Sequence, residues 1–162
     1  MSALNWRDGK NPEVLLVCGA GSGFLPKAPG TWGSVLGLLI WWWLLAPLDW
    51  WVQLGIAAAT FALGWWFIER VTRRFECHDD PAIVIDEIVG IWVALLGIDQ
   101  SAMLALLGFL LFRVLDIAKP WPIGLADRRV PGGFGVMLDD LIAGVLVAMV
   151  LQLSVFATVQ VL

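Results

Sequence analysis

Long apolar stretches are the feature of this sequence that most limits how the chain can fold. A helix needs about 20 apolar residues to cross the hydrocarbon core of a bilayer, and about 17 to 25 are tolerated. Five stretches approach or reach that length, at residues 33–47, 52–68, 83–98, 102–118 and 137–162. The sequence therefore predicts an all-α, polytopic integral membrane bundle, with about five transmembrane helices in a single domain over residues 1–162.

The N-terminal region contains a shorter apolar piece at residues 14–25, interrupted by glycines at 19, 21 and 23. This piece is too short to span, so we expect a re-entrant or interfacial segment. Residues 1–12 are polar and mixed in charge, unlike a cleavable signal peptide. Targeting is therefore expected to depend on the internal apolar segments.

Tryptophan is abundant, with eleven residues against no tyrosine. Its ring is favoured where apolar surface meets the lipid headgroups. We expect an interfacial belt formed by Trp41, Trp42, Trp43, Trp50 and Trp51.

Charge placement predicts the orientation in the membrane. All ten lysines and arginines lie before the first span, between spans two and three, or at the end of span four and beyond it. Because cytoplasmic loops collect basic residues, we expect the N-terminus inside and the C-terminus outside. All but Asp49 and Asp99 of the fourteen acidic residues also fall on the inner side. The rule for cytoplasmic loops does not explain this concentration of carboxylates, so we look for a chemical role for them.

Two acidic pairs enter spans three and five, Asp86-Glu87 and Asp139-Asp140. Acidic residues at a helix start are often caps that satisfy free backbone N–H groups, and this is the simplest alternative. Apolar residues precede both pairs, however, so both are expected at or below the headgroup level, where charges usually have partners. Gly90 and Gly144 follow the pairs and would let the two helices approach closely.

Convergence of these pairs would place four carboxylates together. Without a cation they would repel one another or take up protons. A site built only from oxygen ligands favours Mg²⁺ or Mn²⁺ over zinc. We therefore expect Asp86, Glu87, Asp139 and Asp140 to hold a divalent cation, with Mg²⁺ as the cofactor.

A charged cluster, Arg113, Asp116 and Lys119, lies near one face of span four at i, i+3, i+6 spacing. An Arg–Asp pair that merely anchors the helix end is the alternative. Beside a metal, however, the guanidinium can fork onto phosphate oxygens that the metal does not bind. The pattern favours a site in which Arg113 and Lys119 bind a phosphate group.

Glycine-rich segments, GAGSGFLPKAPGTWGS and PGGFG at 131–135, form a weaker signal. Such turns can present backbone N–H groups to a phosphate, and Thr31 or Ser34 could cap span one while facing the ligand. Neither segment matches a Walker motif. The alternative to phosphate binding is that these glycines only permit a tight turn of the chain.

Other chemistries are disfavoured by absent motifs. Cys18 and Cys77 fit neither a cysteine-phosphatase loop nor a zinc site, and there is no DxD pair. A single histidine excludes enzymes that need one as nucleophile and another as acid. The net charge of −4 argues against nucleic acid as a partner. Metal-assisted attack on phosphorus by water or a carboxylate remains.

Four motifs, PGTWGS, IVIDEIVGIW, FRVLDIAKPWPI and GGFGVMLDD, together resemble phosphatidylglycerophosphatase A, a bacterial inner-membrane family. The resemblance covers residues 19–144. It implies Mg²⁺-dependent removal of the terminal phosphate of phosphatidylglycerophosphate, a phospholipid substrate, with the active site on the cytoplasmic side. The positions that match the family pattern are Thr31, Ser34, His78, Asp79, Asp86, Glu87, Arg113, Asp116, Lys119, Asp127, Asp139 and Asp140.

From these positions we form a mechanistic hypothesis. The two acidic pairs hold one or two Mg²⁺ ions, and Arg113 and Lys119 clamp the phosphate together with Thr31 and Ser34. Asp116 or Asp79 activates water, and His78 protonates the departing alkoxide. Asp80, Arg128 and Arg129 are assigned supporting places around the site.

Two rival functions are considered. A CDP-alcohol phosphatidyltransferase also uses aspartates and Mg²⁺ at the inner face, but its DG(x)₂AR(x)₈G(x)₃D(x)₃D signature is not found. A small transporter would need charges along a path across the membrane, whereas here they crowd one end. The sequence leaves the oligomeric state open.

Overall fold

The computed structural model describes residues 4–77 and 80–161, and its regular elements in those ranges are all helical. The N-terminal part consists of short pieces: η1 (Asp8–Lys10), α1 (Pro12–Val17) and η2 (Gly19–Phe24). The longer elements follow as α2 (Pro29–Ile40), the π-helical turn η3 (Trp41–Leu45), α3 (Trp50–Arg74), α4 (Ile85–Ala94), α5 (Ala102–Ala118), α6 (Ile123–Arg129) and α7 (Gly132–Val161). The predicted all-α class is confirmed.

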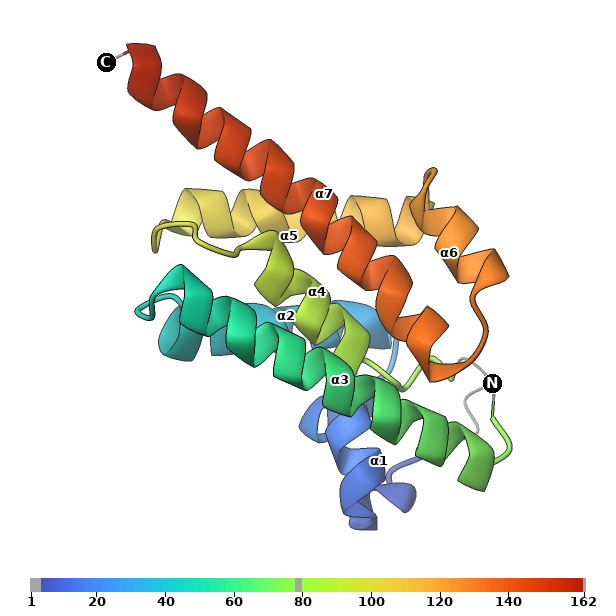
Figure 1. Cartoon of the computed structure of the whole chain (residues 1–162). Helices are drawn as coiled ribbons and strands as arrows, with labels where there is room; N and C mark the ends of the chain where they lie inside the picture. The colour runs from blue at the N-terminus through green and yellow to red at the C-terminus, as the bar shows by residue number, and fades with distance from the viewer. Residues whose placement is uncertain (1–3, 78–79, 162) are drawn as a thin grey trace.

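Helix α4 lies at the centre of the bundle and packs against α2, α3, α5 and α7 (Figure 1). Its residues from Ile88 to Ala94 are all buried. A helix that is apolar on every side is stable only when it is surrounded, by lipid or by protein. Here the surroundings are the other helices.

This central helix is shorter than the span expected at residues 83–98. Its 10 residues rise about 15 Å, roughly half of the 30 Å hydrocarbon thickness. Leu95 and Ile98, which follow it, are buried in the protein. The apolar sequence of this region therefore reflects burial among helices more than contact with lipid.

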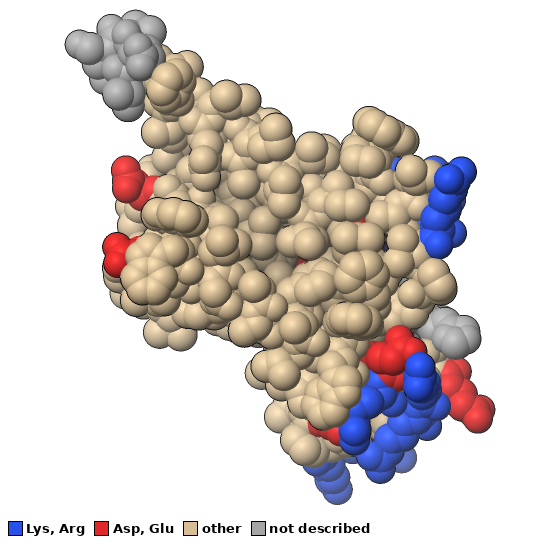
Figure 2. Space-filling model, viewed as in Figure 1, with Lys and Arg blue, Asp and Glu red and all other residues tan. Residues whose placement is uncertain are grey.

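Two helices in the described part of the chain are long and apolar enough to cross a membrane, Trp50–Arg74 and Gly132–Ala157. Large apolar side chains on α3, α5 and α7 are exposed at the molecular surface. In Figure 2 the visible face has an uncharged belt, with the lysines and arginines gathered beyond one edge of it. These features suggest a membrane protein, with α3 and α7 as its best candidates for complete spans.

A tight turn joins the α2–η3 segment to α3, at the predicted Pro47-Leu48-Asp49 position. The Gln53 side chain closes it by donating from Nε2 to the Leu48 carbonyl oxygen at 2.9 Å. The expected tryptophan belt is only partly correct. Trp43, Trp50 and Trp51 are exposed, but Trp41 is fully buried because its side of η3 faces the protein core.

The N-terminal apolar piece forms α1 and η2, which pack beside the bundle. Positive φ angles at Gly19, Ala20 and Gly21 turn the chain within this piece. Val84 N–H donates to the Val17 carbonyl oxygen at 2.9 Å, so the piece is attached to the segment that leads into α4. Neither α1 nor η2 is long enough to span, as the sequence predicts.

Candidate metal and phosphate site

A cavity of about 770 Å³ opens where α4 and α7 begin and where α3 and α5 end. Its wall carries an unusual density of charge for a largely apolar protein. The charged residues that line it are Glu69, Arg73, Asp80, Asp86, Glu87, Arg113, Asp116, Lys119, Asp127, Asp139 and Asp140. The cavity therefore gathers acidic and basic side chains from five different parts of the chain.

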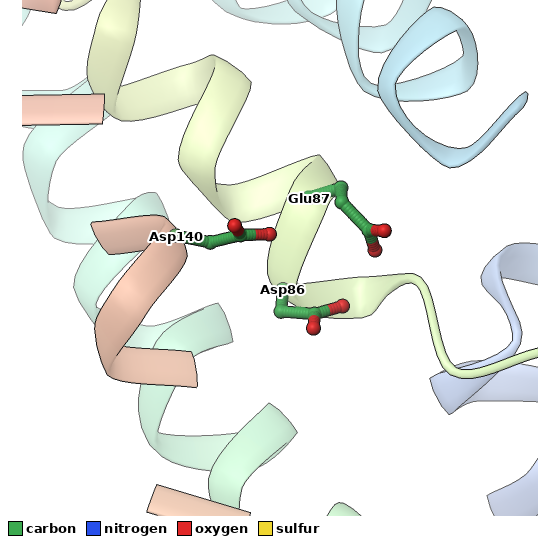
Figure 3. Close-up of side chains that lie close together, drawn as sticks. All are labelled: Asp86, Glu87 and Asp140. Carbon is green, nitrogen blue, oxygen red and sulfur yellow. The ribbon is translucent and has the colours of Figure 1, made fainter. Parts of the chain in front are cut away.

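Three carboxylates meet in this cavity, Asp86 and Glu87 from α4 and Asp140 from α7 (Figure 3). One oxygen atom from each lies within 4.8 Å of the others. Asp86 Oδ1 and Glu87 Oε2 are buried and have no hydrogen-bond partner among the described residues. Such atoms are costly unless something binds them.

Glycines allow these carboxylates to come together. A Cβ atom placed on Gly144 would lie 2.5 Å from the Gly90 carbonyl oxygen, so α4 and α7 cross with their backbones in contact. A Cβ atom on Gly30, in the PGTWGS motif, would overlap the Glu87 carboxylate. The predicted role of Gly90 and Gly144 in close helix approach is confirmed, and Gly30 adds room for Glu87.

The three-carboxylate cluster fits a hard divalent cation. All of its donor atoms are carboxylate oxygens, the ligands that Mg²⁺ and Mn²⁺ prefer. The unpaired oxygens of Asp86 and Glu87 are the atoms that a cation would satisfy. A cation would also remove the repulsion among three neighbouring negative charges.

Arg113 on α5 reaches into the same cavity. Its Nη1 donates to Asp116 in a short ion pair and to Ser34 Oγ at 3.3 Å. Its Nε is buried and has no hydrogen-bond partner among the described residues. Arg113 is also one of the charged neighbours of Glu87. The Nε donor of Arg113 is thus unpaired beside the carboxylate cluster.

Lys119 bridges three helices at the end of α5. Its Nζ donates to Asp127 on α6 and, at 2.8 Å, to Asp139 on α7. Burial alone would lower the pKa of Lys119, but the hydrogen bonds to these two carboxylates outweigh it and raise that pKa above its usual value. Lys119 therefore stays cationic and ties α5, α6 and α7 together.

The ion pair between Lys119 and Asp139 separates Asp139 from the other three carboxylates of the predicted metal site. Asp86, Glu87 and Asp140 form the cluster, whereas Asp139 is bound to Lys119 instead. Successive residues on a helix point about 100° apart, so one member of the Asp139-Asp140 pair faces α4 and the other faces α5. The structure brings both pairs into one cavity but gives their members different partners.

The predicted capping role of Thr31 and Ser34 is wrong. Helix α2 begins at Pro29, earlier than expected, and Ala28 occupies the cap position with no side-chain cap. Ser34 Oγ donates to the Gly30 carbonyl oxygen at 2.8 Å and accepts from Arg113. Thr31 lies one turn earlier in α2 and is not part of the cavity wall.

The glycine-rich segments contribute less backbone to the cavity than expected. Ala28, Pro29 and Gly30 line it, as do Gly132 and Gly135 from the PGGFG motif. Gly19, by contrast, packs against Val84 and Ile88. The first part of the glycine-rich segment therefore serves chain packing.

Among the residues around 80, His78 and Asp79 lie outside the described residues. Asp80 is buried and accepts hydrogen bonds from the backbone of Leu4 and Ala82, at 3.0 and 2.9 Å. It lines the cavity and accepts hydrogen bonds from the backbone of the loop before α4, and its supporting role in the site stays a prediction. Arg128 and Arg129 are not part of the cavity wall.

Helix α3 contributes three cavity residues that no sequence motif indicated, Glu69, Thr72 and Arg73. Glu69 Oε1 accepts from Arg73 at 2.7 Å, and Glu69 Oε2 accepts from the Gly133 N–H at 2.9 Å. Glu69 thereby holds the start of α7 against the end of α3. The only signal in the sequence was an acidic residue four positions before an arginine, a pattern common on solvated helix surfaces.

Comparison with known proteins identifies relatives over most of the chain. The phosphatidylglycerophosphatase A family matches residues 15–155. Phosphatidylglycerophosphatase A of Escherichia coli (strain K12) is 38% identical over 142 residues, 87% of this chain and 82% of that protein. The protein of the same name from Haemophilus influenzae is 40% identical over 136 residues, 83% of each chain.

A third relative comes from Bacteroides thetaiotaomicron and is named "Putative phosphatidylinositol-3-phosphatase". It is 38% identical over 140 residues, which cover 82% of this chain and 86% of that protein. No solved structure matches the chain.

Proposed function

Because this chain belongs to the phosphatidylglycerophosphatase A family, we propose that it hydrolyses the terminal phosphomonoester of phosphatidylglycerophosphate in phospholipid synthesis. The products are phosphatidylglycerol and inorganic phosphate. The observation that carries the proposal is the meeting of Asp86, Glu87 and Asp140 beside an unpaired Arg113 nitrogen in one cavity. Carboxylates that hold a cation next to an arginine make a site for a phosphate group.

The cofactor in this proposal is Mg²⁺, held by Asp86, Glu87 and Asp140. Bound there, it would supply Lewis-acid polarisation of a phosphate oxygen and offset charge that develops at phosphorus. Arg113 donates from Nε to a further phosphate oxygen, because its Nη1 is already held by Asp116 and Ser34. Lys119 keeps Asp139 and Asp127 in place and adds positive charge to the cavity wall.

Hydrolysis requires a water oxygen to attack phosphorus while the bond from phosphorus to the glycerol oxygen breaks. A base must take a proton from the water, and the departing glycerol oxygen must gain one. Asp116 lines the cavity and lies near Asp140 and Glu87, so it is the described candidate for the base. His78 and Asp79, which lie outside the described residues, remain the sequence-based candidates for the acid and for an alternative base.

The same proposal places the protein in a bacterial inner membrane as a multi-pass protein in which α3 and α7 cross completely and the short α4 is enclosed by the other helices. Its N-terminus and its active site face the cytoplasm in this arrangement. The gathering of arginine and lysine at the cavity end of the molecule supports it. So does the cavity position, which lies where α3 and α5 end and α7 begins, close to the expected headgroup level.

The rival functions receive less support. The family and the named relatives are phosphatases, which disfavours a phosphatidyltransferase. A transporter would need polar groups along the bundle, whereas the polar cavity lies at one end of it. The Bacteroides relative does favour a second candidate substrate, a phosphatidylinositol carrying a phosphomonoester on its ring.

The decisive test is phosphate release from defined lipids by purified protein in detergent micelles. Phosphatidylglycerophosphate and phosphatidylinositol 3-phosphate should be assayed side by side, with and without Mg²⁺. We expect faster release from phosphatidylglycerophosphate, and only with the metal. A preference for the inositol lipid would change the substrate, and no release from either would contradict the phosphatase function.

Variants test the site within the same assay. Asp86→Asn and Asp140→Asn should each lower kcat at least about a hundredfold, because each removes a charged ligand oxygen. Asp99→Asn is the matched control, since Asp99 is exposed in the turn before α5, at the far end of that helix from the cavity. Near-normal rates in both site variants would contradict the metal site.

A further inference from the structure

Three basic residues of the described chain line the cavity, Arg73, Arg113 and Lys119. Arg113 and Lys119 come from the end of α5 and are largely engaged with neighbouring carboxylates. Arg73 comes from the last turn of α3, which forms a different wall. The cavity therefore offers positive charge in two separate places.

Arg73 differs from the other two in its exposure. Its side chain is 78% exposed, against 13% for Arg113. Nε and Nη2 of Arg73 donate to Glu69, which fixes the guanidinium direction. Its Nη1 has no hydrogen-bond partner within residues 4–77 and 80–161. Arg73 is thus an oriented, accessible donor at the mouth of the cavity.

Arg73 also borders a second hollow of about 330 Å³, lined otherwise by Glu13, Arg70 and Arg74. It is the only residue of the described chain that lines both hollows. A ligand extending from the carboxylate cluster toward the charged end of α3 would pass this side chain.

The lipids named for the relatives share one chemical feature. Each carries a terminal phosphomonoester on a headgroup that a phosphodiester joins to diacylglycerol. The two anionic groups are separated by a polyol, so a site that holds the monoester leaves the diester several bonds away. Recognition of such a substrate requires a second donor, apart from the one at the reacting phosphate.

We infer that Arg73 binds the phosphodiester of the substrate and so selects lipids that carry two phosphate groups. This inference rests on the proposed phosphatase function and deepens it. The monoester occupies the space beside Asp86, Glu87 and Arg113, and the diester lies at the cavity mouth near α3. Arginine suits this position because its planar fork can donate to Glu69 and to a phosphate oxygen together.

A purely structural role for Arg73 is the competing explanation. Glu69 holds the Gly133 N–H at the start of α7, and α7 carries Asp139 and Asp140. Loss of Arg73 could then disturb α7 through Glu69. The Glu69→Gln variant separates the two roles, because it retains an acceptor for Gly133 while removing the charge that pairs with Arg73.

The test uses two inhibitors, each resembling one half of the substrate. Phosphatidylglycerol has the diester without the terminal phosphate, and inorganic phosphate resembles the terminal group alone. For Arg73→Gln we expect the inhibition constant for phosphatidylglycerol and the KM for phosphatidylglycerophosphate to rise about tenfold. Inhibition by inorganic phosphate should stay unchanged, and kcat should change less than KM.

Three further variants serve as controls. Arg74→Gln removes a neighbouring charge that borders only the second hollow, so it should leave phosphatidylglycerol inhibition close to normal. Glu69→Gln loosens the pair that orients Arg73 but keeps Arg73 itself, so it should raise the inhibition constant for phosphatidylglycerol much less than Arg73→Gln does. Arg73→Lys keeps the charge but loses the planar fork, so it should recover only part of the inhibition by phosphatidylglycerol. Thermal unfolding of each variant checks that the protein is folded.

Several outcomes would overturn the inference. These are unchanged phosphatidylglycerol inhibition in Arg73→Gln, an equal loss of both inhibitions, the same effect from Arg74→Gln, or reproduction of the effect by Glu69→Gln. A wild-type protein that releases no phosphate from phosphatidylglycerophosphate would instead defeat the proposed function itself. The wild-type assay therefore distinguishes the two failures.

Discussion

The backbones of Gly90 on α4 and Gly144 on α7 are in direct contact. A Cβ atom on Gly144 would lie 2.5 Å from the Gly90 carbonyl oxygen, and one on Gly90 would lie 2.5 Å from the Phe112 ring. This crossing lies one turn beyond the acidic residues on each helix. It sets the separation of Asp86 and Asp140, so the geometry of the candidate site depends on it.

Substitution of Gly144 by alanine should therefore damage the site. The new methyl group would meet backbone atoms, which cannot rotate away, so α4 and α7 must separate. We expect a loss of about 1–3 kcal/mol in stability and a fall in kcat of about tenfold or more. Thermal unfolding and phosphate release measure the two effects.

Gly55→Ala is the matched control for this substitution. Gly55 lies in α3, and a Cβ atom there would have no neighbour within 4 Å. Its activity and unfolding temperature should equal or slightly exceed those of the wild type, because alanine favours a helix more than glycine does. Equal behaviour of the two variants would show that the α4–α7 contact tolerates a methyl group.

The sequence predicts this convergence because charge and glycine patterns are local. Asp86-Glu87 and Asp139-Asp140 each follow apolar residues, and Gly90 and Gly144 follow in turn. Ionisable groups in an apolar setting must find partners, so two such pairs on neighbouring helices are expected to meet. The structure confirms that they reach one cavity.

Other features depend on helix rotation and length, which the pattern does not contain. Hydropathy cannot distinguish contact with lipid from burial among helices, so residues 83–98 are predicted as a full span although α4 ends at Ala94. Neighbouring aspartates look equivalent in sequence, yet Asp140 joins the cluster and Asp139 binds Lys119. Glu69 and Arg73 look like a solvated surface pair until α7 is placed against α3.

Asp139 and Asp140 should differ in their effect on metal dependence. Because Asp140 belongs to the carboxylate cluster, Asp140→Asn should raise the Mg²⁺ concentration needed for half-maximal activity. Asp139→Asn should lower activity at all Mg²⁺ concentrations with little change in that midpoint, because its partner is Lys119. Mg²⁺ titration of phosphate release by each variant measures this.

A double-variant cycle checks the reason for that difference. Asp139→Asn combined with Lys119→Gln should cost about as much as Lys119→Gln alone, because that change already breaks the ion pair with Asp139 as well as the one with Asp127. Additive losses would show that the pair contributes little. A raised Mg²⁺ midpoint in Asp139→Asn would place Asp139 among the metal ligands, as the sequence analysis proposed.

Metal binding should also be measurable without activity. Asp86, Glu87 and Asp140 are held close together, so a bound cation should stabilise the folded protein. At about 100 times the dissociation constant, the gain is about 2.7 kcal/mol. The unfolding temperature in micelles should rise with Mg²⁺ and fall when a chelator is added.

Variants show whether the stabilising cation binds at the carboxylate cluster. Asp140→Asn should lose the Mg²⁺-dependent rise and should be at least as stable as the wild type without metal, because one of three neighbouring charges is gone. Asp99→Asn should keep the full rise. A rise of equal size in Asp140→Asn would place the stabilising cation elsewhere.

The cysteines should be chemically inert in the folded protein. Cys18 is fully buried, and burial together with the neighbouring Asp80 raises the pKa of its thiol to about 12. At pH 8 only roughly one thiol in ten thousand would be the reactive thiolate. We therefore expect N-ethylmaleimide to leave Cys18 unlabelled in micelles and to label it after denaturation, with phosphate release unchanged by the reagent. Cys18→Ala identifies its labelled peptide by mass spectrometry, and rapid labelling of Cys18 in the active enzyme would show that the α1–η2 segment opens away from the bundle.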